Sequence, residues 1–218
     1  MKPVLHATFA AVAGSLLSAC ASPPPAQSDS ERRGEQIAVA QHRADRALLR
    51  DDLRGAQNQY QLALDRGRAA RDPDAIAVGL LNLAAVLHRD GDLAAARAQL
   101  LELLASQPPF GPPYAGRAEA RLALIELQSN RLDEAARHAQ NAEALCTASA
   151  CPWRIALANV QAAIALRSGD LAGAEARARA ALAAAAAAKD VREEANARRL
   201  LGEIAGERGR AAGMREVK

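Results

Sequence analysis

Residues 88–100, HRDGDLAAARAQL, contain a triplet that returns further along the chain. The triplet Gly-Asp-Leu starts at Gly91 and again at Gly169, within RSGDLAGAEARA. Midway between them, in SNRLDEAARHAQ, Asn130 takes the place of the glycine, so that the three positions are 39 residues apart. A fixed period of this length indicates one supersecondary unit that is repeated along the chain.

The second half of each unit carries apolar or small side chains at spacings of three, four and three, which form one face of an α-helix. The four sets are Leu53, Ala56, Tyr60, Ala63; Leu93, Ala96, Leu100, Leu103; Leu132, Ala135, Ala139, Ala142; and Leu171, Ala174, Ala178, Ala181. The second member is always alanine, which lets two helix backbones approach closely. A turn (RDDL, DGDL, SNRL or SGDL) precedes each set, where glycine or asparagine ends one helix in the left-handed conformation and aspartate caps the next.

Another apolar helix precedes each turn. In AIAVGLLNLAAVLHR, for example, Leu80, Leu83, Ala84 and Leu87 share one face. The composition agrees with helices, because Ala and Leu supply most of the apolar residues and aromatic residues make up 2% of the chain, too few for a sheet. We therefore predict an all-α chain of four helix–turn–helix units in series.

This pattern resembles the tetratricopeptide repeat (TPR), a helical hairpin of about 34 residues. The second helix of that repeat carries Ala-x₃-Phe/Tyr-x₂-Ala, as Ala56, Tyr60 and Ala63 do, and LLNLAAVLHRDGDLAAARAQLLEL matches both helices. The resemblance implies a right-handed solenoid of about four hairpins, followed by the helix containing RRLLGEIAGERGR, which is the first helix of an unfinished fifth unit and acts as a C-terminal cap. We predict the solenoid over residues 31–209 and a polar tail over residues 210–218.

The chain departs from the repeat pattern in three respects. Its period is longer, the closing proline of each repeat is mostly missing, and the first helices of units three and four carry Glu126 and Gln161 at apolar positions. A shift of one residue improves some positions and spoils others, so both registers stay open. The proline-rich joint ASQPPFGPPYAG is either a spacer or a second contact surface with exposed aromatic residues.

The first 20 residues have the layout of a secretory signal, with a basic start, a short apolar run and small residues before Cys20. LSAC (residues 17–20) resembles the bacterial lipobox, whose cysteine is lipidated after cleavage. The resemblance implies a signal peptide over residues 1–19, a diacylglycerol thioether and an N-acyl chain such as palmitate on Cys20, and, since Ala21 follows, an outer-membrane position facing the periplasm. Residues 20–30 are predicted as an extended Pro/Ser-rich tether. An ordinary secreted protein with an incidental cysteine is the alternative.

Two further cysteines, Cys146 and Cys151, lie close together in CTASACPW. An exported protein meets oxidising conditions, so this pair predicts a structural disulfide. A redox-active pair or half of a metal site are alternatives, although redox pairs prefer a two-residue spacer and no second cluster completes a zinc site.

The sequence gives no catalytic constellation. His42, His88 and His138 are scattered among charged neighbours and are predicted to be solvated. The serines lack a nucleophile-elbow context, and no glycine-rich phosphate loop follows a strand. The net charge of +3 comes from interspersed acids and bases, without a tract dense enough for nucleic acid. We predict a protein that is not an enzyme and has neither a cofactor nor a nucleic-acid partner.

In stacked hairpins the first helices line a concave face. The resemblance places there Leu81, Asn82, His88, Arg117, Arg121, Leu124, Leu127, Asn159 and Leu166. Leucines with a few donors and arginines suit an amphipathic helix or an extended peptide. Asn82, Arg117 and Arg121 also match three of five positions that hold a C-terminal carboxylate in some TPR domains, but Gln41 and Asp45 do not match the other two.

These observations predict a lipid-anchored periplasmic scaffold or adaptor that binds a protein or peptide partner in an envelope assembly. Similar lipoproteins act in pilus and secretion systems, in outer-membrane protein assembly and with cell-wall enzymes. A small-ligand or cell-wall-fragment binder, with an aromatic or polar pocket, is the first alternative. An enzyme accessory subunit with a redox-active cysteine pair is the second, and a homo-oligomer stays open.

Overall fold

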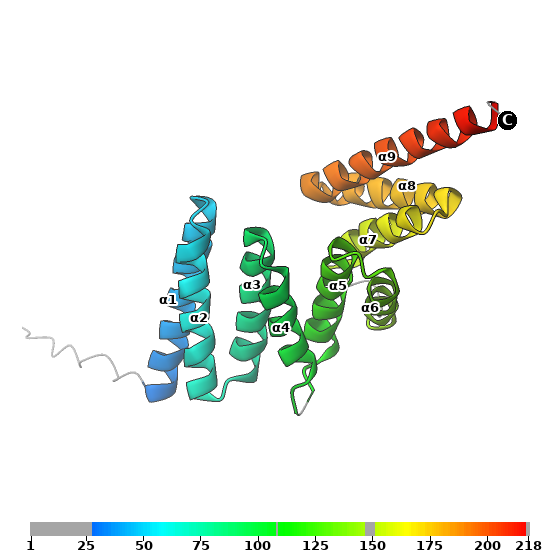
Figure 1. Ribbon diagram of the computed structural model, residues 1–218. Coiled ribbons are helices and arrows are strands. Elements are labelled where there is room, and N and C mark those ends of the chain that lie inside the picture. Colours follow the sequence, from blue (N-terminus) through cyan, green and yellow to red (C-terminus); the bar gives the residue numbers. More distant parts are fainter. Residues whose placement is uncertain (1–27, 108, 147–150, 217–218) are drawn as a thin grey trace, which may run out of the picture.

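The computed structural model describes residues 28–107, 109–146 and 151–216. Within these ranges every regular element is an α-helix, and consecutive helices pack as hairpins (Figure 1). The helices are α1 (Asp29–Leu49), α2 (Leu53–Ala70), α3 (Pro73–Asp90), α4 (Leu93–Leu104), α5 (Pro112–Gln128), α6 (Leu132–Ala144), α7 (Arg154–Arg167), α8 (Leu171–Ala188) and α9 (Val191–Glu216). The prediction of an all-α solenoid with a final capping helix is confirmed.

The turns inside the hairpins follow the repeated triplet. Gly91, Asn130 and Gly169 have φ angles of 89°, 60° and 81°, and Asp51 takes the same conformation in the first hairpin. The next aspartate then accepts a hydrogen bond from a backbone N–H in the first turn of the following helix, in three of the described hairpins: Asp52, Asp92 and Asp170. In the third hairpin Arg131 replaces the aspartate and makes no such bond.

Small side chains hold the helices close together. The alanine in the second position of each set is fully buried in all four hairpins: Ala56, Ala96, Ala135 and Ala174. Between α2 and α3, a Cβ added to Gly79 would lie 3.0 Å from Leu64 Cβ, a tighter contact than Cβ atoms usually make. Close backbone approach, rather than large aromatic side chains, therefore builds this core.

Both ends of the solenoid lie beyond their predicted bounds. The helix α1 begins at Asp29, inside the predicted tether, because Ser28 and Glu31 form a capping box. The helix α9 continues to Glu216, so most of the predicted tail from residue 210 is helical. The predicted signal peptide and Cys20 lie outside the described residues. None of the described helices is long and apolar enough to cross a membrane.

The two polar residues at apolar positions behave differently. The Glu126 side chain is fully buried, and its carboxylate accepts hydrogen bonds from Arg97, whose Nε lies 2.6 Å away, and from Arg131. The unshifted register therefore holds in α5, where an ion-paired carboxylate takes the place of an apolar side chain. In α7, Gln161 is partly exposed while Val160 and Ala162 beside it are buried, so this helix is rotated relative to that register.

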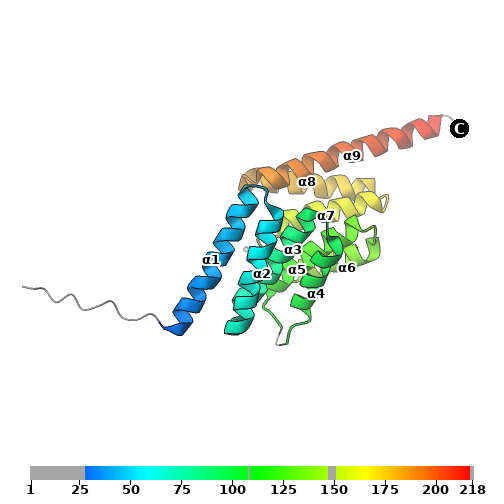
Figure 2. The same cartoon turned by 60° about the vertical axis from the view of Figure 1, so that its left-hand side comes forward.

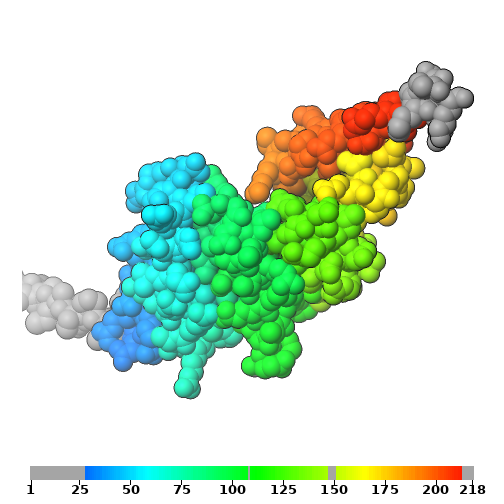
Figure 3. Space-filling model, in the orientation of Figure 1, coloured from blue at the N-terminus to red at the C-terminus, as the bar shows by residue number. Residues whose placement is uncertain are grey.

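The hairpins are joined in two ways. A left-handed residue, Arg71 or Lys189, makes the tight turns from α2 to α3 and from α8 to α9. Longer segments, residues 105–111 and 145–153, join α4 to α5 and α6 to α7, and these two pairs pack less extensively. The hairpins follow one another in chain order, and α9 projects beyond α8 (Figure 2). A recess lies beside the orange start of α9 on the surface (Figure 3).

The longer joints contain packed side chains. Trp153 is 8% exposed, its ring lies against Gly116, and its indole N–H donates to the Ala142 carbonyl at 3.2 Å. In the proline-rich joint, Phe110 and Tyr114 are partly buried against the N-terminal core with their rings edge to face. The Tyr114 hydroxyl also donates to an Asp74 carboxylate oxygen at 2.9 Å. These contacts favour the spacer over the second contact surface.

Candidate functional site

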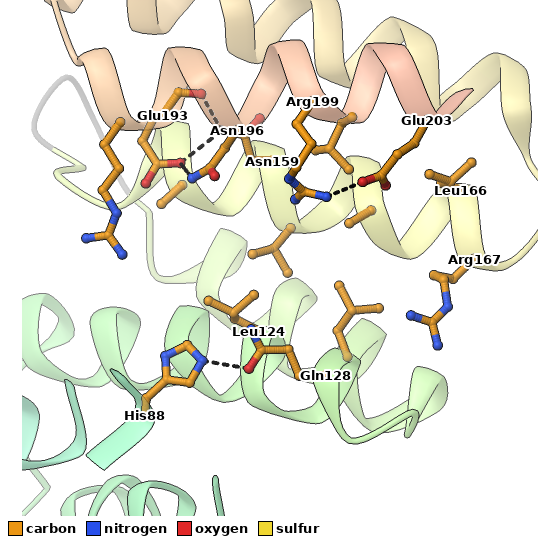
Figure 4. A pocket seen from close by; sticks show the side chains of 16 residues that line it. His88, Leu124, Gln128, Asn159, Leu166, Arg167, Glu193, Asn196, Arg199 and Glu203 are labelled. Atoms are coloured by element: carbon orange, nitrogen blue, oxygen red, sulfur yellow. Dashed lines mark hydrogen bonds and ion pairs between the residues drawn. The ribbon is translucent and has the colours of Figure 1, made fainter. Parts of the chain in front are cut away.

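A groove of about 460 Å³ runs along the first helices of the later hairpins and reaches the capping helix (Figure 4). Its walls come from the C-terminal end of α3, from α5, from α7 and from the first half of α9. Leu124 and Leu127 of α5 and Leu166 of α7 form part of its apolar wall. Solenoid hairpins present such surfaces because each first helix contacts the next one along the stack.

Five of the nine residues predicted for the groove line it: His88, Leu124, Leu127, Asn159 and Leu166. The prediction is wrong for Leu81, which is 3% exposed and packs in the core shared by the first hairpins. The reason is that α3 is buried on most of its sides, not on one face only, because apolar side chains surround most of its circumference. Asn82 is partly buried on α3 outside the lining.

Arg117 and Arg121 lie beyond the lining, but they belong to the same face of α5. Together with Leu124 and Gln128 they occupy positions i, i+4, i+7 and i+11, which form one stripe along a helix. The groove wall formed by α5 therefore continues into two arginines.

Hydrogen bonds fix several polar side chains of the groove (Figure 4). His88 Nε2 and Gln128 Oε1 lie 2.6 Å apart and connect α3 with α5. Asn159, which is 5% exposed, donates from Nδ2 to the backbone oxygen of Glu193 at 3.0 Å and to its carboxylate at 2.9 Å. Arg199 and Glu203 pair with each other on α9. Asn159 thus attaches α9 to α7.

The end of the groove near the start of α9 is electropositive. Burial, followed by the charges of Arg117 and Arg192, lowers the pKa of Arg121 to about 10. Burial also lowers the pKa of His88; its hydrogen bond to Gln128 acts in the opposite direction, and the charges of Arg121 and Arg192 lower the pKa further. Four basic side chains from α3, α5 and α9 therefore affect one another here.

Sequence reasoning missed the part of the site that α9 supplies. Arg192, Glu193 and Arg199 all line the groove, whereas the last helix was expected only to cover the fourth unit. The period of 39 residues carries the signal, because it leads from Arg121 to Val160 and then to Arg199. Extending the groove positions into the unfinished fifth unit would have included the capping helix in the concave face.

Two of the three histidines are less solvated than predicted. His42 is exposed, as expected. His138 Nδ1 lies 2.6 Å from a carboxylate oxygen of Glu119, and its side chain is 12% exposed. Glu119 is itself buried and also accepts from Asn141, so the pairing with His138 satisfies a carboxylate that would otherwise be costly to bury.

The other sites considered from the sequence were for redox chemistry, a metal, a small ligand or a C-terminal carboxylate, and the described residues bear on each of them. Cys146 and Cys151 form a disulfide. Nowhere in the described part of the chain do three His, Cys, Asp or Glu side chains gather as metal ligands. The described groove lining contains no Phe, Tyr or Trp. Asp45, at one of the unmatched carboxylate-binding positions, accepts a hydrogen bond from the Tyr60 hydroxyl at 2.5 Å and does not face the groove.

The fold is similar to that of a solved structure. The crystal structure of BtubC (BKLC) from P. vanneervenii superposes with a TM-score of 0.56 and 17% sequence identity, over 86% of this chain and 94% of that chain. At this identity the likeness concerns the fold alone. No protein-family model and no curated protein matches the sequence.

Proposed function

We propose that this protein is a lipid-anchored adaptor of the TPR type that binds a segment of a partner protein in the groove on its concave face. The observation that carries the proposal is the groove itself, which combines leucines from α5 and α7 with polar side chains from four helices. Its volume lies in the range of specific binding sites. A groove with a mixed apolar and polar lining suits a peptide segment better than it suits the flat surface of a folded protein.

A crosslinking experiment in cells tests this proposal. A photo-crosslinking amino acid is placed at Gln128, which lies in the groove, and in a matched control at Gln140, which is exposed on α6. We expect the groove position to capture one dominant protein that the control position does not capture. The combined substitution Arg117→Glu and Arg121→Glu should remove that product. Equal capture from both positions, or from neither, would exclude the groove as the binding surface.

The anchor is the second part of the proposal. We propose that Cys20 is lipidated after removal of residues 1–19 and holds the solenoid at the outer membrane, on the periplasmic side, where it serves an envelope assembly. A lipobox-type sequence ending in this cysteine supports it. Metabolic labelling with an alkyne fatty acid should mark the wild-type chain, and Cys20→Ser should lose the label and move to the soluble periplasmic fraction. A labelled Cys20→Ser chain would contradict the anchor while leaving the groove proposal intact.

A further inference from the structure

Three arginines lie at one end of the groove without an ion-pair partner among the described residues. Arg117 and Arg121 lie one turn apart on α5, and Arg192 lies in the first turn of α9. Among the described residues, no hydrogen bond or ion pair connects these three guanidinium groups with a carboxylate. Like charges that are brought together without counter-charges destabilise the free protein, so the cluster favours an anion.

The two acidic side chains that line the groove are already engaged. The Glu193 side chain accepts from Asn159 and, at 3.2 Å, from Asn196. Glu203 pairs with Arg199. Neither carboxylate therefore forms an ion pair with the arginine cluster. Glu193 keeps its negative charge because its donors are neutral amides, but the three guanidinium groups outnumber it, so the cluster favours a ligand that brings further negative charge.

Asn159 holds the start of α9 beside the arginine cluster. Its Nδ2 faces two oxygen atoms of Glu193, which fixes the orientation of the amide, and its Oδ1 is buried with no hydrogen-bond partner in the described structure. A buried acceptor without a donor costs about 1–3 kcal/mol. This oxygen lies too deep for a ligand in the groove to reach, so the free protein carries this cost where α7 meets α9.

The shape of the surface also suits an extended segment. Leu124, Leu127 and Leu200 give the groove an apolar wall beside the charged end. A second hollow shares Leu166 and Arg199 with the groove and continues along α9. A chain bound at the arginine cluster therefore has a continuous path across the molecule.

We propose that the groove recognises an acidic segment of the partner protein. A side-chain carboxylate of Asp or Glu binds among Arg117, Arg121 and Arg192, and a neighbouring apolar side chain packs on the leucines. Guanidinium groups bind carboxylates with two parallel hydrogen bonds, so three of them give strong selection for this charge. This inference rests on the proposed function and adds the chemistry of the partner and a direct role for α9.

Peptide selection followed by titration tests the inference. A library of random peptides of about twelve residues is selected on the purified full chain, and the best peptide is titrated by fluorescence anisotropy against two double variants. Arg121→Gln with Arg192→Gln removes two of the three charges of the cluster. Arg54→Gln with Arg137→Gln removes the same charge from exposed positions on second helices, outside the groove.

We expect Asp or Glu next to apolar residues in the selected peptides, an affinity lowered about tenfold or more by the cluster variant, and a change below about twofold in the control. Selection of apolar peptides that bind both variants equally would overturn the acidic segment and leave the adaptor proposal standing. If no peptide is selected, both proposals fail. Inorganic phosphate and phosphatidylglycerol vesicles are then tested as competitors of a selected peptide. If either displaces it at the same concentration of negative charges as an unlabelled acidic peptide does, the site binds anions in general and the inference is wrong.

Discussion

Arg121 lies partly buried between two other arginines, an arrangement that favours binding of an anion and opposes folding of the free chain. The substitution Arg121→Met keeps the apolar stem and removes the charge. We expect it to raise the apparent free energy of unfolding by about 0.5–2 kcal/mol, as substitutions that relieve an unfavourable functional site do. Urea denaturation followed by circular dichroism measures the change.

The matched control is Arg137→Met, at an exposed arginine of α6 away from the groove. Surface substitutions of this kind change stability by no more than about 0.5 kcal/mol. A destabilised Arg121→Met chain would show that Arg121 has a structural role, contrary to the charge repulsion that we assign to it in the free protein.

Glu126 makes stability depend on pH. Burial raises the pKa of its carboxyl group, but hydrogen bonds from Arg131 and Arg97 and their charges lower it more, so that the pKa lies below the usual value. A depressed folded-state pKa contributes stability above the unfolded value of about 4.3, and this contribution is lost as the pH falls further.

Removal of both partners should reverse this dependence. In Arg97→Met with Arg131→Met the buried carboxylate has no counter-charge, which costs about 3–5 kcal/mol at pH 7. Burial then raises its pKa, so the folded state binds the proton more tightly and the variant should regain stability as the pH falls from 7 towards 5. Thermal denaturation of the variant and the wild type at both pH values measures the difference. A deficit that is equal at both pH values would exclude the charge as its cause.

At the scale of the elements, the contact between α5 and the start of α7 depends on one glycine. A Cβ added at Gly116 would lie 2.3 Å from Cζ2 of Trp153, a ring edge that cannot move without leaving its site. We expect Gly116→Ala to cost about 1–3 kcal/mol, as overpacking does. Because Trp153 is the only tryptophan of the chain, its fluorescence should shift to the red as the ring becomes exposed.

Gly202, in the interior of α9, provides the matched control. No atom lies within 4 Å of a Cβ added there, so Gly202→Ala should stabilise the chain by about 0.4–1 kcal/mol through the unfolded state. Unchanged fluorescence in Gly116→Ala would mean that the joint moves as a unit and that the glycine is not required for its packing.

The elements themselves could be predicted because local signals and the repeat agree. The triplets around Gly91 and Gly169 combine a left-handed residue, a capping aspartate and a helical apolar stripe, and each of these acts within a few residues. Glu126 could not be interpreted in this way, because its partners Arg97 and Arg131 come from α4 and from the turn before α6. A buried charge is compatible with the core only through contacts that a local pattern does not contain.

At the scale of the molecule, α9 covers the apolar face of the fourth hairpin with Ala197, Leu200 and Ile204, all nearly fully buried. In a solenoid each unit is stabilised mainly by its neighbours. A chain that ends at residue 190 should therefore lose hydrogen-exchange protection in α7 and α8, while α1 to α4 keep theirs. Loss of protection throughout the chain would instead show that the array unfolds as one cooperative unit.

The groove was predictable only in part, because some of its residues meet through contacts between hairpins that the repeat does not specify. His88, Leu127 and Leu166 repeat at the period of the hairpins, and the stacking of first helices brings them together. The rotation of α7 and the contribution of Arg192 depend on how hairpins dock across the longer joints, which the period does not specify. The sequence therefore predicts the face that carries the groove more reliably than the side chains that meet on it.

The two longer joints have a mechanical consequence. They separate the array into α1–α4, α5–α6 and α7–α9, and each of these blocks contributes residues to the groove. If the chain is tethered at one end and loaded through a bound partner, stretching should concentrate between α4 and α5 and between α6 and α7, the consecutive helices that pack least extensively. If a partner binds in the groove as proposed, bending at either joint would change the width of the groove and so couple tension on the array to the strength of binding.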